Sequence, residues 1–257
     1  MTGTLGLVMA TATREPQPAA APPRPSVPAP LATATGAFWG ALSRLRGGRR
    51  SLHPIGIGFE ARLVVGDVGP EVGVPLFDSP GSHRALVRFS RGAGLPEPLP
   101  DILGIALRVL DAHGPGAHQD FLLATSSGAP VAHHALLPAR SFFGRTFSSI
   151  LTYSMGGSPY VVGARSRSDA PHDGDAGLGG VAMAAARGAL AYDVAIARPL
   201  GRFAPVARVE VGERLPDDES ERLRFNVWNS GGGIRPSGPF QGVRMPAYEG
   251  SQSGRRT

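Results

Sequence analysis

The chain has 257 residues, and its 26 basic residues, all of them arginine, outnumber the 20 acidic ones and give a net charge of +6. This length suits one domain with a single large core. The absence of cysteine excludes disulfides, thiolate-bound zinc, iron–sulfur clusters and a cysteine nucleophile. The apolar runs are too short to cross a bilayer, so we expect no membrane span.

The positive charge does not by itself predict a nucleic-acid-binding protein. The arginines are scattered and only 7% of the residues are aromatic, whereas nucleic-acid-binding faces combine clustered charge with aromatic side chains. We therefore expect a solvated surface and no nucleic-acid partner. A charge-driven binder of nucleic acid or of a lipid surface is kept as an alternative.

The first 35 residues are rich in Ala, Thr and Pro, with seven prolines between Pro16 and Pro30. Because proline interrupts both helices and central strands, we predict a disordered or extended arm over residues 1–35. The short apolar patch at residues 5–9 has no basic residue before it, so we expect no secretory signal and a cytoplasmic location. Residues 36–257 are predicted to form one domain, beginning with a short amphipathic helix around residues 38–45.

From Leu52 onward, short segments with the alternating pattern of strands dominate. Strands are predicted at residues 58–65, 85–90, 104–110 and 120–124, and the last two flank a Gly/Pro-rich turn typical of a hairpin. Helices are predicted around residues 141–153 and 181–190, and further strands at 192–197, 206–211 and 223–228. Strands, then helices, then strands indicate an α+β fold, an antiparallel and closed β-barrel with helices packed around it.

Two patterns carry candidate chemistry. Gly56 and Gly58 follow His53 closely, and paired glycines let a flat group approach the backbone. Arg244 and Tyr248 are four residues apart, so on a helix the guanidinium would lie beside the phenol and favour the phenolate, which is a ligand for ferric iron. Taken alone, each pattern is also typical of ordinary structure, a His before a kinked strand and a surface Arg–Tyr contact.

Taken together and in order, these motifs resemble the haem catalase family, and in particular its minimal, catalase-related branch. The resemblance covers about residues 50–256 and is carried by Arg50-x-x-His53-x-x-Gly56-x-Gly58, Val87-Arg88-Phe89-Ser90, Asp120 at a strand, and Arg244-x-x-x-Tyr248. It implies a catalase-like barrel that binds one haem b.

The resemblance also implies a role for individual residues. His53 matches the distal base that shuttles a proton between the two peroxide oxygens, Ser90 the hydroxyl that fixes the tautomer of this base, and Tyr248 the phenolate ligand of the iron. Three arginines match residues that pair with the haem propionates, namely Arg50, Arg88 and Arg255. A fourth, Arg244, matches the residue that keeps the phenolate ionised.

Two departures from the family pattern affect the expected activity. Counting from Asp120, the distal Asn of the family falls on Thr125, and a hydroxyl offers fewer hydrogen-bonding atoms than an amide. We also expect the chain to lack the helical region that follows the proximal helix in full catalases. Both departures favour weak or no true catalase activity and a more open haem pocket, with a homo-oligomer left open.

We therefore expect a haem peroxidase that reduces hydrogen peroxide or organic hydroperoxides with an electron donor. The alternatives are a haem-dependent fatty-acid hydroperoxide isomerase or dehydratase, and a non-catalytic haem-binding protein. Phe142, Phe143 and Phe147 of the predicted middle helix would line the distal channel or belong to the core. The glycines after Trp228 would let the chain pass beneath the haem or form a connector.

Overall fold

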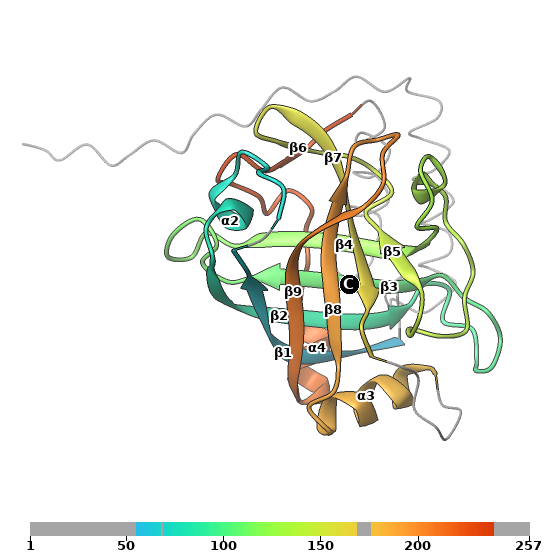
Figure 1. Cartoon of the computed structure of the whole chain (residues 1–257). Coiled ribbons are helices and arrows are strands. Elements are labelled where there is room, and N and C mark those ends of the chain that lie inside the picture. Colours follow the sequence, from blue (N-terminus) through green and yellow to red (C-terminus); the bar gives the residue numbers. More distant parts are fainter. Residues whose placement is uncertain (1–54, 68, 169–175, 239–257) are drawn as a thin grey trace, which may run out of the picture.

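The computed structural model describes residues 55–67, 69–168 and 176–238, and these residues form a closed antiparallel β-barrel (Figure 1). Neighbouring strands around the barrel follow the order β1-β2-β3-β4-β5-β7-β8-β9, and the pairing of β9 with β1 completes the ring. The strands are β1 Ile55–Val65, β2 Gly81–Arg91, β3 Leu103–Val109, β4 Gln119–Ser126, β5 Thr146–Ser148, β7 Ser158–Ser166, β8 Ala191–Ala197 and β9 Ala204–Arg214. The predicted antiparallel barrel is confirmed.

Shorter elements decorate the barrel. The strands β6 (Tyr153–Met155) and β10 (Arg235–Pro236) extend the sheet beyond β7. The helix α3 (Leu178–Ala186) packs against β9, and α4 (Asp217–Arg222) packs against β1. The remaining elements are the one-turn helix α2 (Pro75–Asp78) and the 3-10 helix η1 (Ala132–His134). Within the described ranges, no helix is long and apolar enough to span a bilayer.

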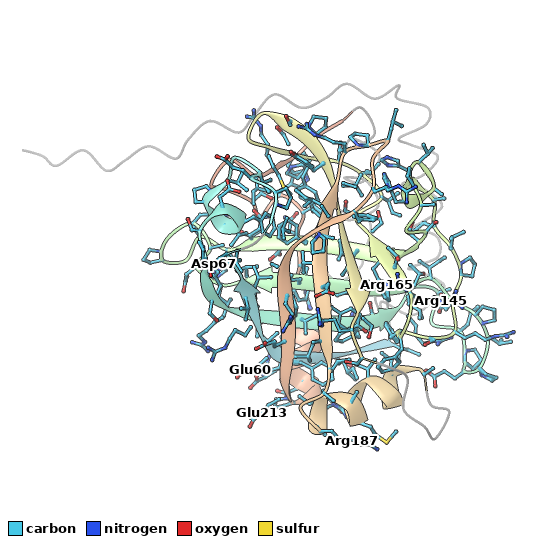
Figure 2. All side chains as sticks on the ribbon, viewed as in Figure 1. Glu60, Asp67, Arg145, Arg165, Arg187 and Glu213 are labelled. Carbon is cyan, nitrogen blue, oxygen red and sulfur yellow. The ribbon has the colours of Figure 1, made fainter. Side chains whose placement is uncertain are left out.

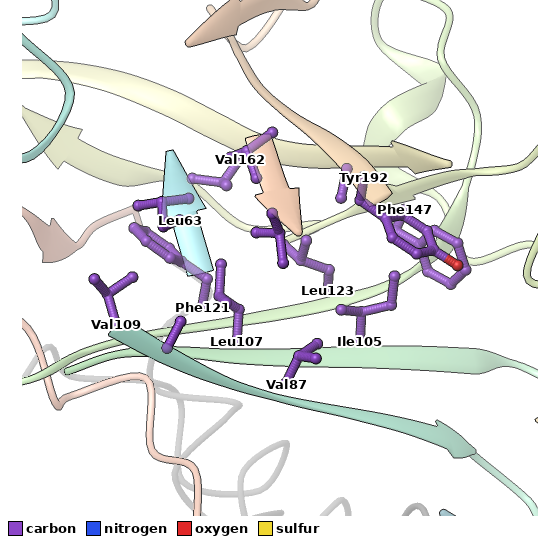
Figure 3. Packing of buried hydrophobic residues seen from close by; sticks show 14 of the residues in the cluster. Leu63, Val87, Ile105, Leu107, Val109, Phe121, Leu123, Phe147, Val162 and Tyr192 are labelled. Carbon is purple, nitrogen blue, oxygen red and sulfur yellow. The ribbon is translucent and has the colours of Figure 1, made fainter. Parts of the chain in front are cut away.

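Alternation along each strand divides the barrel into a packed interior and an outer wall. In β1 to β4 the odd-numbered positions point inward, as Val87, Ile105 and Phe121 show in Figure 3. Val162 of β7 and Tyr192 of β8 meet them from the opposite side of the barrel. The interior is therefore a filled hydrophobic core, and the even-numbered positions of β1 to β4 are left to form the outer wall.

The prediction of a helix over residues 141–153 is wrong. The chain there is a loop followed by β5 and β6, and Gly144 has a φ of +64°, which no α-helix contains. Phe142 and Phe147 are fully buried and stack with centroids 6.1 Å apart, while Phe142 also meets Phe89 edge-on. These aromatic side chains, Phe143 included, belong to the core.

The prediction of a strand over residues 223–228 is also wrong. The apolar residues of this segment do not pair with a neighbouring strand but have separate surroundings. Phe225 lies under the guanidinium of Arg108, 5.2 Å from ring centroid to Cζ, and Val227 is buried at 1% exposure.

The predicted hairpin is confirmed, with Arg108 on β3 opposite Asp120 on β4. The predicted arm at residues 1–35 and the helix near 38–45 lie outside the described residues.

Charges of both signs are distributed over the surface of the barrel. Figure 2 labels Arg145 and Arg165 near β5 and β7, and Arg187 just after α3. Glu60 and Glu213 lie toward the α3 end of the barrel in the same view. This mixture of signs fits the solvated surface expected from the sequence.

Candidate functional site

The outer wall between β1 and β4 carries unusually small side chains around two polar residues. Gly56 pairs with Ser90, Ser90 with Gly104, and Gly104 with Ala124, so one row across four strands is nearly free of side-chain bulk. In the next row Arg88 lies between Gly58 and Ala106. The two rows together form a flat strip of wall on which Arg88 and Ser90 supply the polar groups.

Gly56 is required for the position of the Arg88 side chain. A Cβ at residue 56 would lie 2.7 Å from Arg88 Cζ and 2.5 Å from the carbonyl oxygen of Phe89, closer than real Cβ contacts allow. The guanidinium therefore lies across the backbone of β1 in the space that glycine leaves. The flat group that approaches this glycine in the structure is the chain's own arginine.

Gly58 makes room for helix α4. A Cβ at residue 58 would lie 2.9 Å from Ser220 Oγ and 3.3 Å from Leu215 Cδ1. The local sequence explains the helix, because Pro216 precedes three acidic residues, which favour a first turn, and Ser220 N donates to Pro216 O at 2.9 Å. Helix α4 thereby covers part of the wall beside Arg88.

Arg88 is a buried cation at 4% exposure. Burial lowers the pKa of Arg88 to about 10, the charge of Glu221 partly offsets this, and the charge of Arg224 adds to the lowering. The guanidinium still carries its charge at neutral pH, although burying that charge costs free energy. An anionic group that approached this wall would stabilise that charge.

Ser90 is buried beside Arg88 on the outer face of β2. Its exposure is 4%, and its Oγ lies 3.5 Å from the carbonyl oxygen of Gly104.

Thr125 does not share a face with Ser90. It occupies an inward, odd-numbered position of β4, is 1% exposed, and its Oγ1 accepts a hydrogen bond from Leu103 N at 3.1 Å. The residue of β4 in the same row as Ser90 is Ala124. The described residues therefore give Thr125 a backbone partner rather than a place on the wall, and its catalytic role stays a prediction.

Of the predicted site residues, the structure brings Arg88 and Ser90 together on the outer face of β2. Thr125 lies on the inward side of β4, away from them. The remaining predicted residues lie outside the described ones, namely Arg50, His53, Arg244, Tyr248 and Arg255. Among the described residues, no group of His, Asp and Glu is arranged to hold a metal ion. The role of Tyr248 as the iron ligand therefore stays a prediction.

Two features of the wall were not recognised from the sequence. One is α4 with Ser220, for which the Pro-Asp-Asp-Glu run at residues 216–219 was an available helix-start signal. The other is the ion pair of Arg108 and Asp120, joined by two hydrogen bonds of 2.7 Å. Since both residues lie in the predicted hairpin at facing positions, strand register could have indicated it.

No protein-family model matches this chain, and no curated protein is similar to it in sequence. Among solved structures, the chain is similar to a bacterial catalase, with a TM-score of 0.58 and 15% identity over 84% of this chain and 60% of that one. It is similar to a fungal catalase, with a TM-score of 0.59 and 14% identity over 84% and 61%. Catalase A from Saccharomyces cerevisiae gives a TM-score of 0.57 and 13% identity over 84% and 63%.

The chain therefore spans less than two thirds of the length of each of these catalases. At such low identity the likeness concerns the fold and not the activity. The barrel described here has a catalase-like fold.

Proposed function

We propose that the chain is a haem-dependent peroxidase of the catalase-related type, with weak or no true catalase activity. The observation that carries this proposal is Arg88, a buried cation on a flat, glycine-rich outer wall of a catalase-like barrel, next to the hydroxyl of Ser90. The substrate would be hydrogen peroxide or an organic hydroperoxide, together with an electron donor.

The described residues of the wall fit a planar dicarboxylate macrocycle. Small side chains in the row of Ser90 leave a flat surface, and Arg88 offers a fork of N–H donors suited to a carboxylate. Arg50 and Arg255 would bind carboxylates with it, Tyr248 would be the iron ligand, and Arg244 would keep that phenol ionised. Bound haem would supply a redox-active iron for peroxide cleavage.

The protein's own residues would handle protons and orientation. His53 would take the proton of the hydroperoxide and return it to the departing oxygen, while Ser90 would hold the imidazole in one tautomer. Overall, the O–O bond breaks as two electrons from the donor and two protons convert a hydroperoxide into an alcohol and water. Ala124 has no polar side-chain atom to offer in the row of Ser90, which supports reduction of peroxide over efficient disproportionation.

The first test is the visible absorption spectrum of protein produced with added haem precursor, compared with Tyr248→Phe. We expect a high-spin ferric spectrum typical of a tyrosinate ligand that is lost or altered in the variant. Tyr160→Phe is the matched control, because Tyr160 lies on β7, outside the wall of β1 to β4, and its ring contacts Arg198. A protein that binds no haem, or a Tyr248→Phe spectrum identical to wild type, would contradict the proposal.

A second measurement separates the reaction classes. A peroxidase oxidises a hydrogen-donor dye in the presence of peroxide, whereas an isomerase or dehydratase consumes a fatty-acid hydroperoxide without any added reductant. Haem binding with no turnover of either kind, unchanged by His53→Ala, would instead identify a non-catalytic haem-binding protein.

A further inference from the structure

Ser220 of α4 has a buried hydroxyl that none of the described residues satisfies. The residue is 1% exposed, and its Oγ has no hydrogen-bond partner within the part of the chain that the structure describes. Buried hydroxyl groups in native proteins are nearly always hydrogen-bonded, since an unmade bond costs free energy. An unsatisfied hydroxyl of this kind is available to donate to a ligand atom or a water.

The position of Ser220 indicates which group it meets. Its Oγ lies over Gly58, while the guanidinium of Arg88 lies over Gly56, and both glycines face outward from β1. Alternate residues of a strand are about 7 Å apart, so the hydroxyl and the guanidinium lie beside each other along one strip of wall. One carboxylate group is of the size to accept hydrogen bonds from both.

The chemistry of the two donors also agrees. Arg88 presents N–H groups in a fixed fork, and a serine hydroxyl can rotate its hydrogen toward any acceptor. The charge balance favours an anion, because burial costs the Arg88 cation more than the charge of Glu221 returns. A carboxylate would gain both charge compensation and paired hydrogen bonds from Arg88, whereas a cationic ligand would be repelled.

We propose that Ser220 is a cofactor-binding residue whose hydroxyl donates a hydrogen bond to the carboxylate held by Arg88. Resting on the function proposed above, this carboxylate is one propionate of the haem. Helix α4 then has a role in the site: it closes the propionate end of the wall and supplies the second donor.

The test is the binding of iron porphyrin to the apoprotein, measured for wild type and Ser220→Ala. Loss of a hydrogen bond to a charged group should weaken binding of the dicarboxylate porphyrin about tenfold. The dimethyl ester of the same porphyrin, which has no carboxylate, should bind both proteins equally. Asp218→Asn is the matched control in α4, since Asp218 forms an exposed pair with Arg222.

Folding of the variant is checked by thermal unfolding of the apoprotein. Alanine favours helix more than serine, and no hydrogen bond is lost, so the apoprotein should be at least as stable as wild type. Wild type that binds porphyrin while Ser220→Ala binds it equally well would overturn the role of Ser220 and leave the proposed function intact. Wild type that binds no porphyrin would overturn both.

Discussion

Asp120 on β4 accepts two hydrogen bonds of 2.7 Å from the guanidinium of Arg108 on β3, and a third of 2.8 Å from the backbone N–H of Asn226. The carboxylate is fully buried, and the backbone N–H of Asp120 donates to the carbonyl oxygen of Asn229. This one side chain therefore fastens the segment after α4 to the outer wall of the barrel. The hydrogen bond to Asp120 also raises the pKa of Arg108.

We predict that Asp120→Asn lowers the free energy of unfolding by about 3 kcal/mol, because it leaves a partly buried guanidinium without its counter-ion. Denaturant unfolding at neutral pH measures the loss. Asp193→Asn is the control, since Asp193 pairs with Arg167 at a much more exposed position and should cost less than about 1 kcal/mol. Equal losses in the two variants would contradict the fastening role.

Gly56→Ala should displace the guanidinium of Arg88. The new Cβ would require space now filled by Arg88 Cζ at 2.7 Å and by the backbone oxygen of Phe89 at 2.5 Å. We expect both a loss of stability and at least a tenfold loss of affinity for haem, measured by titration of the apoprotein. Gly81→Ala at the start of β2 is the control, because nothing lies within 4 Å of its added Cβ. If Gly56→Ala and Gly81→Ala bound haem with equal affinity, Gly56 would not be needed for haem binding.

The barrel was predictable because its strands carry local signals. Alternation marks β1 to β4, and the Gly/Pro turn at residues 111–118 joins β3 to β4 as a hairpin. Because side chains alternate along a strand, the predicted strand at residues 85–90 also puts Arg88 and Ser90 on one face of β2. Register then follows from burial, since a shift by one residue would turn Val87 and Phe89 out of the core.

Other parts depend on contacts that a single sequence does not display. The spacing of the aromatic residues near Phe142 is typical of a helix. In the structure they lie in an irregular segment with a left-handed Gly144, and they are still buried in the core. Residues 223–228 alternate like a strand, yet Asp120 and Arg108 hold them as a loop. Thr125 was chosen by counting along the chain, and a difference of one residue in β4 decides between the wall and the interior.

Thr125 gives a direct test of its place in the structure. Its Oγ1 accepts the N–H of Leu103 at 3.1 Å in a buried setting, so Thr125→Val should leave that N–H without a partner. We expect a loss of about 1–3 kcal/mol in the free energy of unfolding. Thr125→Ser keeps the acceptor and should recover most of the loss. If the valine variant were as stable as the serine variant, the hydrogen bond to Leu103 would not matter.

His133 of η1 should make the stability of the protein depend on pH. The side chain is fully buried, its Nε2 lies 2.9 Å from the carbonyl oxygen of Pro199, and its ring packs on Phe203 with centroids 5.2 Å apart. Burial lowers the pKa of His133, the hydrogen bond to Pro199 partly opposes this, and the neighbouring His134 lowers it further. The folded protein therefore holds this imidazole in its neutral form.

The direction of the effect follows from proton linkage. As the pH falls through the ordinary histidine pKa of about 6.5, the unfolded chain takes up a proton that the folded chain refuses, so the free energy of unfolding decreases. The decrease ends once the pH is below the lowered pKa of the folded state. His133→Gln removes the titrating group, so its stability between pH 8 and pH 5 should fall less steeply than that of wild type. Each protein is compared with its own stability at pH 8, so that any packing loss from the substitution cancels. Parallel pH profiles would show that the neutral, buried ring of His133 does not contribute to acid destabilisation.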